Sequence, residues 1–323
     1  MEKSKRLVFF GTPEFAVPAL EALFFTDRVP LAIVTAPDRP AGRGLTITPS
    51  PISQYATKKG FSGSLLKPTR IDDVTVADIA ALHPTIGVVV AYGLILPQRL
   101  IDLFPEGLFN IHPSLLPRHR GSAPLQYQVL EGDTQCGVSI MKIDAQMDHG
   151  PICVQESFAV DSASITYTEL HDMSAQKGAD LLVKALGDLD QGALSFTPQD
   201  DTKATYTRLL KKTDGLIDWA ESASEIDRKV RALNPWPGVF SFLGTKRIKV
   251  LKTSLMTDGT KSDVAIGSLY ADTSRLFVAT EGGPICIEMI QMEGETAMTG
   301  ERFVGTHGSM LPASLKSPSV EKS

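Results

Sequence analysis

Two side chains that could do chemistry together stand two positions apart near residue 110. Asn110 and His112 close an apolar run, and Pro113 then removes a backbone donor and ends the strand. Side chains two apart on an extended chain lie on the same face. We therefore expect an amide and an imidazole side by side at the carboxyl end of a strand, where open α/β sheets bind ligands. A capped strand end with a purely structural histidine is the alternative.

A carboxylate could complete this pair. Residues 137–143 and 152–158 alternate like the strands of an antiparallel hairpin, and Asp148 lies in the turn between them. Next to His112, this carboxylate would favour and orient the charged imidazole. The alternative is a turn aspartate that bonds only to its own backbone. The neighbouring His149 is assigned no role.

An amide, an imidazole and a carboxylate together suit the transfer of an acyl group from a carrier to an amine. The amide stabilises an oxyanion on a tetrahedral carbon, and the imidazole moves one proton. Covalent catalysis has no candidate, because no serine stands in a nucleophile-elbow motif and no cysteine neighbours His112. The six histidines show no zinc-site spacing, so we expect no metal.

Composition describes an ordinary globular protein. The 323 residues are 42% hydrophobic and 21% charged, which allows two domains with full cores. A net charge of −5 argues against a protein that coats nucleic acid without specificity. Three widely spaced cysteines form no metal or disulfide pattern, and the first apolar run is too short for a signal peptide. We expect a cytoplasmic protein.

The elements that would position the three side chains alternate between strand and helix. Buried strands are predicted at 6–10, 31–35 and 86–91 and at Asn110, and helices at 15–24, 126–130 and 164–187. This pattern predicts an α/β fold with a doubly wound, mostly parallel sheet. Thr12 is the expected N-cap of the first helix. The turn at Gly11 lacks the Gly-x-Gly-x-x-Gly fingerprint, so no dinucleotide site is predicted.

Residues 36–51 have the composition of a long loop. They contain four prolines, two glycines and two arginines, from which we expect no regular element. Such a segment is either disordered or a mobile arm. As an arm, its cations Arg39 and Arg43 could order on a phosphate-bearing partner.

The second half predicts a small barrel. Short strands are expected at 239–243, 247–251, 267–270, 276–279 and 285–291, after a helix at 225–233, and this spacing is typical of an oligonucleotide-binding (OB-like) barrel. The predicted division is a catalytic domain at 1–189, a linker at 190–208, a barrel at 209–314 and a disordered tail at 315–323. Cations gather in the barrel region: Lys211, Lys212, Arg228, Lys229, Arg231, Lys246, Arg247, Lys249 and Lys252. They indicate either a solvated surface or a phosphate-tracking face.

Several motifs together resemble the 10-formyltetrahydrofolate-dependent formyltransferase family. The motifs are 109–117, 120–124 and 147–148, which include Asn110, His112 and Asp148. Further stretches at 37–44, 49–51, 89–97 and 234–237 are similar to the members that act on initiator methionyl-tRNA. The resemblance spans about residues 5 to 310 and keeps the family's order of motifs.

The resemblance implies a Rossmann-like catalytic domain that moves a formyl group from 10-formyltetrahydrofolate to the amino group of methionyl-initiator-tRNA. It implies that Asn110, His112 and Asp148 are the catalytic trio. The implied folate contacts are Ser114, Leu115, Leu116, Pro117, Tyr92, Gly93, Leu94 and Ile95. The implied tRNA contacts are Arg39 and Arg43 in the arm, and Lys211, Lys212, Lys246, Arg247 and Lys249 in the barrel. A monomer without membrane attachment is expected.

Two stretches depart from the family pattern by losing positive charge. The segment 45–48 lacks the lysine pair that often follows the arm's Gly-Arg-Gly, and Gly294 to Met298 lacks a second such pair. Both changes bear on the strength and salt dependence of tRNA binding.

Three rival functions remain open at this point. Glycinamide ribonucleotide formyltransferases resemble the first domain but lack the barrel and the arm. Sugar-nucleotide formyltransferases have a barrel-like second domain but lack the arm as it stands here. A folate- or RNA-binding module without activity would leave the intact trio unexplained.

Overall fold

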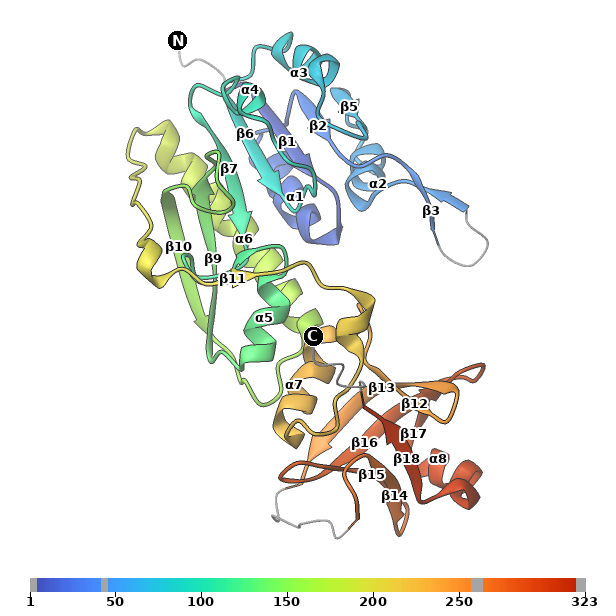
Figure 1. Ribbon diagram of the computed structural model, residues 1–323. Coiled ribbons are helices and arrows are strands. Elements are labelled where there is room, and N and C mark those ends of the chain that lie inside the picture. The colour runs from blue at the N-terminus through green and yellow to red at the C-terminus, as the bar shows by residue number, and fades with distance from the viewer. Residues whose placement is uncertain (1–4, 42–45, 257–263, 318–323) are drawn as a thin grey trace. The chain divides into compact units, whose positions relative to one another are not determined.

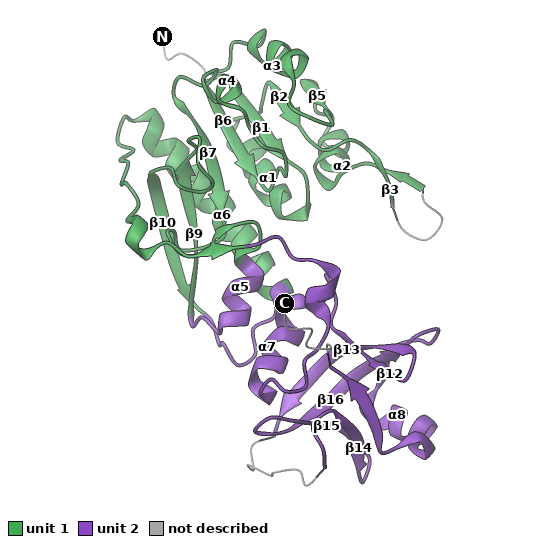
Figure 2. Cartoon of the chain, in the orientation of Figure 1, with its two compact units in different colours: residues 1–124, 135–159, 168–207 green, residues 125–134, 160–167, 208–323 purple. Residues whose placement is uncertain are grey.

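The computed structural model describes residues 5–41, 46–256 and 264–317 (Figure 1). Figure 2 colours its two compact units. Unit 1 comprises Met1–Pro124, Gln135–Ala159 and Thr168–Thr207, and unit 2 comprises Leu125–Thr134, Val160–Tyr167 and Arg208–Ser323. Two short segments that lie within the predicted catalytic domain at 1–189 thus belong to unit 2. Within the described ranges, no helix has both the length and the apolar character needed to cross a membrane.

Unit 1 is built on a seven-stranded sheet in the order β10-β9-β7-β6-β1-β2-β5. The strands are β1 (Leu7–Gly11), β2 (Ala32–Val34), β5 (Ser64–Leu66), β6 (Ile86–Val90), β7 (Gly107–His112), β9 (Gln135–Lys142) and β10 (Ile152–Ala159). The first five pair in parallel, and β9 is antiparallel to both of its neighbours. The predicted doubly wound, mostly parallel sheet is therefore confirmed. Its continuous apolar runs are the central strands, which are buried on both faces.

The helices of unit 1 cover the two faces of this sheet (Figure 1). They are α1 (Val17–Phe25), α2 (Pro51–Lys58), α3 (Asp73–Ala80), α4 (Gln98–Ile101) and α6 (Tyr167–Asp190). One core cluster joins β1 and β6 to α3 and α4 through Phe10, Val89, Ile79 and Leu100. The predicted cap at Thr12 is wrong, because a 3-10 turn at Glu14–Ala16 precedes α1. The Thr12 hydroxyl instead lies 3.4 Å from the main-chain oxygen of Tyr92.

The arm is more regular than its composition suggested. β3 (Arg39–Ala41) and β4 (Thr46–Thr48) form an antiparallel hairpin, in which Pro40 pairs with Ile47. The expectation of no regular element is therefore wrong for these six residues. A two-stranded ladder tolerates a proline because each strand has an unpaired edge. Arg43 lies outside the described residues.

Unit 2 contains a closed barrel whose strand order is β13-β12-β18-β14-β15-β16, with β16 pairing back onto β13. The strands are β12 (Phe240–Leu243), β13 (Lys246–Leu255), β14 (Ser268–Asp272), β15 (Arg275–Thr280), β16 (Gly283–Met292) and β18 (Ala313–Lys316), with β17 (Met298–Thr299) added to β16. The helices of this unit are α5 (Pro124–Glu131), α7 (Ala223–Leu233) and α8 (Gly300–His307). The predicted barrel is confirmed.

The predicted disordered tail is wrong at its start. β18 fills the gap between β12 and β14 and pairs with both, and its Leu315 is only 5% exposed. The strand forms because it closes the barrel and removes two exposed sheet edges, although only two of its four residues are apolar.

The segment predicted as a linker carries structure of its own. It contains a 3-10 turn at Asp201–Lys203 and the strand β11 (Tyr206–Thr207), which pairs in parallel with β8 (Arg120–Gly121). This pairing holds the end of the segment against unit 1, directly after the motif that follows His112.

Candidate active site

Asn110 and His112 lie at the carboxyl end of β7, as the sequence predicts. β7 runs between parallel β6 and antiparallel β9, so its last residues are held on both sides. Leu108, two residues before Asn110, belongs to the core cluster beneath α3 and α4. Alternation along the strand places Asn110 and His112 on that same face, at the edge of the apolar core. The opposite face carries Ile111, which packs against Gly178 of α6.

The His112 imidazole is 3% exposed and faces two acceptors. Its Nε2 lies 3.0 Å from the main-chain oxygen of His119. Because a carbonyl oxygen only accepts, Nε2 carries the proton of this hydrogen bond. Its Nδ1 lies 3.6 Å from Oδ1 of Asp148, within ion-pair distance but too long for a hydrogen bond. The ring is therefore held between a main-chain dipole and a carboxylate.

Asp148 is held from its own side of the pair. Its Oδ2 accepts a hydrogen bond of 2.8 Å from the main-chain N–H of Gly121, so its other oxygen faces the imidazole. The residue has a φ of 50°, a left-handed conformation that is uncommon for a residue with a side chain. The hairpin tip thus holds this carboxylate in a specific orientation. Asp148 is therefore more than a turn aspartate that bonds only to its own backbone.

The Asn110 side chain differs from its neighbours in being uncommitted. It is half-buried and makes no hydrogen bond to any residue that the structure describes. An amide in this position has both of its N–H groups available to an incoming oxygen. The Asn110 amide and the His112 imidazole can both donate hydrogen bonds to a carbonyl oxygen that becomes negatively charged during a reaction.

The predicted folate segment 114–117 is held by the β9–β10 hairpin. The Ser139 hydroxyl donates to the main-chain oxygen of Ser114 and accepts from the N–H of Leu116, at 2.6 and 3.2 Å. The Gln155 amide donates to the Leu116 oxygen at 3.0 Å. The Ser114 hydroxyl is fully buried and donates to the Arg118 oxygen, so this side chain shapes the loop from inside.

The second predicted folate segment divides between core and surface. The Tyr92 ring is 5% exposed and packs edge-on against Phe10, and burial raises the pKa of its hydroxyl. Its side chain therefore belongs to the core. Gly93 is exposed with a φ of 84°, Leu94 is half-buried, and Ile95 is 91% exposed. An apolar side chain as open as Ile95 suits contact with a flat ligand ring.

The basic residues considered as nucleic-acid contacts differ in their exposure and in whether they pair with other residues of the chain. Arg39 is exposed on β3, and Lys211 and Lys212 are exposed at the 3-10 turn Lys212–Gly215. Lys246 and Lys249 are exposed on β13. Three other cations of unit 2 are engaged within it: Arg228 donates to the Leu130 oxygen, Lys229 pairs with Glu221 and Arg231 pairs with Asp227. Of the predicted tRNA contacts that the structure describes in unit 2, the exposed lysines thus lie on β13 and next to the 3-10 turn Lys212–Gly215.

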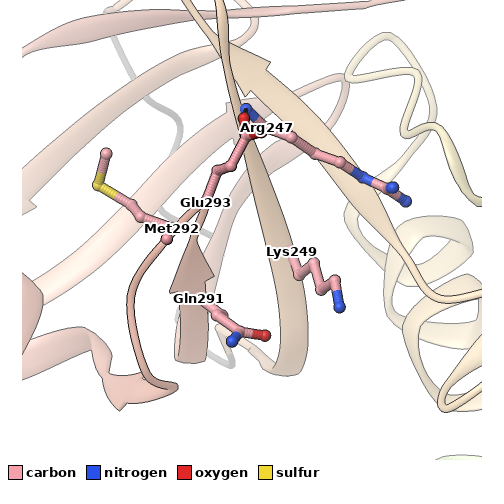
Figure 3. Close-up of a pocket in the computed structure, with 6 residues that line it drawn as sticks. Arg247, Lys249, Gln291, Met292 and Glu293 are labelled. Atoms are coloured by element: carbon pink, nitrogen blue, oxygen red, sulfur yellow. Dashed lines mark hydrogen bonds between the residues drawn. The ribbon is translucent and has the colours of Figure 1, made fainter. Parts of the chain in front are cut away.

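A shallow pocket of about 280 Å³ lies over this part of β13. Its lining comprises Arg247, Lys249, Gln291, Met292, Glu293 and Gly294. Gln291 stands opposite Lys249 in the β13–β16 register, and the guanidinium of Arg247 lies 3.7 Å from the centre of the Phe240 ring. Figure 3 shows the Arg247, Lys249 and Gln291 side chains on one side of the strands. The surface combines two cations and an amide with the Glu293 carboxylate, which accepts from the main-chain N–H of Arg247 at 3.1 Å.

The fold and the site together define a formyl transferase, and the chain belongs to that family. The formyl transferase family model matches residues 5–186, and the model of the formyl transferase C-terminal domain matches residues 209–308. The match covers both the sheet that carries Asn110, His112 and Asp148 and the barrel.

Curated relatives narrow the class further. The chain is 37% identical over 310 residues to a methionyl-tRNA formyltransferase of Coxiella burnetii (strain RSA 331), covering 95% of this chain and 97% of that protein. It is 40% identical over 298 residues to one of Pseudomonas fluorescens (strain SBW25), covering 92% of each. Because the matches cover 92 to 95% of the chain, they include residues of both units.

Solved structures of more distant proteins share the fold. An N-formyltransferase from Helicobacter canadensis, in complex with folinic acid and dTDP-3-aminofucose, has a TM-score of 0.66 at 18% identity, covering 90% of this chain and 100% of that chain. HypX from Aquifex aeolicus, in complex with tetrahydrofolic acid, has a TM-score of 0.63 at 15% identity, covering 94% and 47%. At such identities the likeness shows the fold alone.

Proposed function

We propose that this chain transfers a formyl group from 10-formyltetrahydrofolate to the free amino group of methionyl-initiator-tRNA, giving N-formylmethionyl-tRNA for translation initiation. The observation that carries the proposal is the grouping of Asn110, His112 and Asp148, with the Asp148 carboxylate 3.6 Å from the imidazole. Sequence similarity to methionyl-tRNA formyltransferases over 95% of the chain supports the acceptor.

The reaction conserves its atoms with no redox step. The amine nitrogen forms a bond to the formyl carbon, the bond from that carbon to the donor nitrogen of the folate breaks, and one proton passes from the amine to that donor nitrogen. In the tetrahedral intermediate the formyl oxygen becomes negative, and Asn110 and His112 donate hydrogen bonds to it. Asp148 stabilises the positive imidazole. His112 reaches the reacting oxygen by exchanging its hydrogen bond with the main chain of His119.

The residues around the trio fit a folate donor. Ser139 and Gln155 hold the main chain of Ser114 and Leu116, so the segment 114–117 offers a rigid edge to a pteridine. Gly93 and Ile95 are exposed and Leu94 is half-buried, so this loop supplies mostly apolar contacts. Within the proposal, Ser114 and Tyr92 act by shaping these two segments. The step needs no metal, since two hydrogen-bond donors stabilise the oxyanion.

The tRNA contacts are part of the same proposal. Arg39 and Arg43 on the arm, and Lys211, Lys212, Lys246, Arg247 and Lys249 in unit 2, would contact phosphates. Residues 1–189 would form the catalytic domain and 209–314 the tRNA-binding domain. We propose further that the protein acts as a monomer in the cytoplasm.

A transfer assay with parallel acceptors tests the proposal. The protein is mixed with 10-formyltetrahydrofolate and with charged initiator methionyl-tRNA, glycinamide ribonucleotide or a sugar-nucleotide amine. The proposal predicts formylation of the charged tRNA and none of the small amines. Formylation of a small amine alone would retain the chemistry of the trio and refute the assignment of the arm and barrel.

A further inference from the structure

The loop that carries Asp148 is tied to a side chain from a distant part of unit 1. The amide nitrogen of Gln199 lies 2.8 Å from the main-chain oxygen of Asp148 and 2.7 Å from that of Gly150. One amide has two N–H groups, and here both are used on the same short loop. The two acceptors flank His149, so Gln199 clamps the loop on either side of that residue.

The other end of the Gln199 amide is fixed by Arg120. The amide oxygen accepts from Nε and Nη2 of Arg120, at 3.0 and 2.8 Å. A guanidinium only donates and a carbonyl only accepts, so the partners on the two sides leave the amide one possible orientation. The clamp therefore has a defined direction, from Arg120 through Gln199 to the main chain of Asp148.

Arg120 is itself immobilised. It is 1% exposed, and its guanidinium also donates to Asp201 at 2.8 Å and to the hydroxyl of Tyr206 at 3.2 Å. The neighbouring Gly121 supplies the N–H that Oδ2 of Asp148 accepts. The strand β8 therefore acts on Asp148 twice, on the carboxylate directly through Gly121 and on the backbone through Arg120 and Gln199.

We propose that Gln199, held by Arg120, is a positioning residue for catalysis, which sets the Asp148 carboxylate against His112. This inference rests on the proposed function of the trio and extends it to residues outside the reacting groups. Asp148 has a left-handed backbone, and such conformations persist where surrounding contacts enforce them. Without the clamp, the loop can relax, and the carboxylate can leave its place beside the imidazole.

The test is Gln199→Leu, which keeps the approximate size of the side chain and removes its hydrogen bonds. We expect kcat for tRNA formylation to fall about 10- to 100-fold, because misplacing a catalytic group by about 1 Å costs on that order. KM for folate and for tRNA should change less than about threefold. Gln191→Leu is the matched control, an exposed glutamine in the same segment, and should keep the wild-type kcat. Wild-type turnover with Gln199→Leu would refute the inference while leaving the proposed function intact.

A double substitution separates positioning from a general effect on folding. In an Asp148→Asn background, Gln199→Leu should lower kcat by less than about twofold more, because residues that act through one group are non-additive. An undiminished 10- to 100-fold loss in that background would show that Gln199 acts on something else. Arg120→Lys keeps the positive charge but loses the two guanidinium donors that bind the Gln199 oxygen. It should therefore show part of the fall in kcat that we expect for Gln199→Leu.

A spectroscopic measurement tests the clamp whether or not the tRNA is the acceptor. The imidazole nitrogen resonances of His112, assigned by their loss in His112→Gln, should shift in Gln199→Leu in the same direction as in Asp148→Asn. Unshifted resonances would overturn the inference. If the wild-type protein fails to formylate the tRNA while these shifts occur, the proposed function fails and the clamp stands.

Discussion

The corner around His112 and the basic face of the barrel are built in opposite ways. In the corner, the imidazole is 3% exposed and Arg120 is 1% exposed, and each is held by named partners. On β13, Lys246 and Lys249 are exposed and make no ion pair with any residue in the described part of the chain. The residues around His112 hold their side chains in fixed orientations. The lysines on β13 supply positive charge on side chains whose orientation is not fixed.

This difference matches the demands of the two proposed tasks. Stabilising an oxyanion requires donors placed within a few tenths of an ångström, which a mobile side chain does not provide. Attraction to a phosphate backbone depends on charge and falls gradually with distance, so flexible lysines serve it well. Substitutions in the corner should therefore change the rate, and substitutions on the barrel should change affinity.

The largest effect is expected from the corner's own donors. His112→Ala should lower kcat by about 10²- to 10⁴-fold, the usual contribution of a positioned acid–base group. Asn110→Ala should lower it by about 10²- to 10³-fold, since it removes one oxyanion donor. The KM for tRNA should be unchanged in both variants. Steady-state formylation assays measure both kcat values. A wild-type kcat in both variants would refute the assignment of Asn110 and His112 to the active site.

A smaller loss is expected from moving the backbone of the corner. A side-chain carbon at Gly150 would lie 1.8 Å from the main-chain oxygen of Lys142, so Gly150→Ala forces the loop to shift. We expect kcat to fall about 10- to 100-fold from the displacement of Asp148. Gly187→Ala, on α6, meets nothing within 4 Å and is the control. Equal rates for the two variants would show that the loop position is unimportant.

On the barrel, the expected change is in affinity. Lys246→Ala combined with Lys249→Ala should weaken tRNA binding about tenfold and reduce the slope of log Kd against log salt by about 1 to 2, with kcat unchanged. Lys229→Ala is the control, because that lysine is already paired with Glu221 at 2.8 Å. Filter binding at several salt concentrations measures the slope. A slope unchanged by the double substitution would place the tRNA elsewhere.

The smallest effect concerns His149, between Asp148 and Gly150. Its pKa is raised, chiefly by the hydrogen bond to Asp144 at 2.7 Å and further by Asp201. A raised pKa contributes stability below the unfolded value of about 6.5, and this contribution disappears as the pH rises through the folded value. His149→Gln should therefore lower Tm at about pH 6 and leave it unchanged at about pH 9. Thermal unfolding at both pH values checks the sign, and a difference that grows with pH contradicts it.

Local patterns in the sequence were sufficient to predict the strand end that carries Asn110 and His112. The apolar run and the proline after it act over neighbouring residues, and the hairpin that bears Asp148 alternates with period two. The barrel strands were predicted in the same way. What these elements share is that the burial of their own side chains determines their conformation.

Elements that form through distant partners were missed. β18 exists because β12 and β14 leave a gap between them. The hairpin of β3 and β4 is local and was missed for another reason, because the composition of its residues indicates a loop. Gln199 stands 51 residues from Asp148, in a polar segment with no periodicity. The one signal in the sequence was the Arg120–Gly121 pair directly after the His112 motif, and its partners became visible only in the folded chain.

The most direct test of the account measures two quantities on the same preparations. The single-turnover rate of formyl transfer to methionyl-tRNA and the Kd for that tRNA are determined for His112→Ala and for the Lys246→Ala, Lys249→Ala double variant. The account predicts a rate loss of at least about 10²-fold with unchanged Kd in the first, and an unchanged rate with about tenfold weaker binding in the second. If either variant changes both quantities together, chemistry and tRNA binding are not divided between the corner and the barrel.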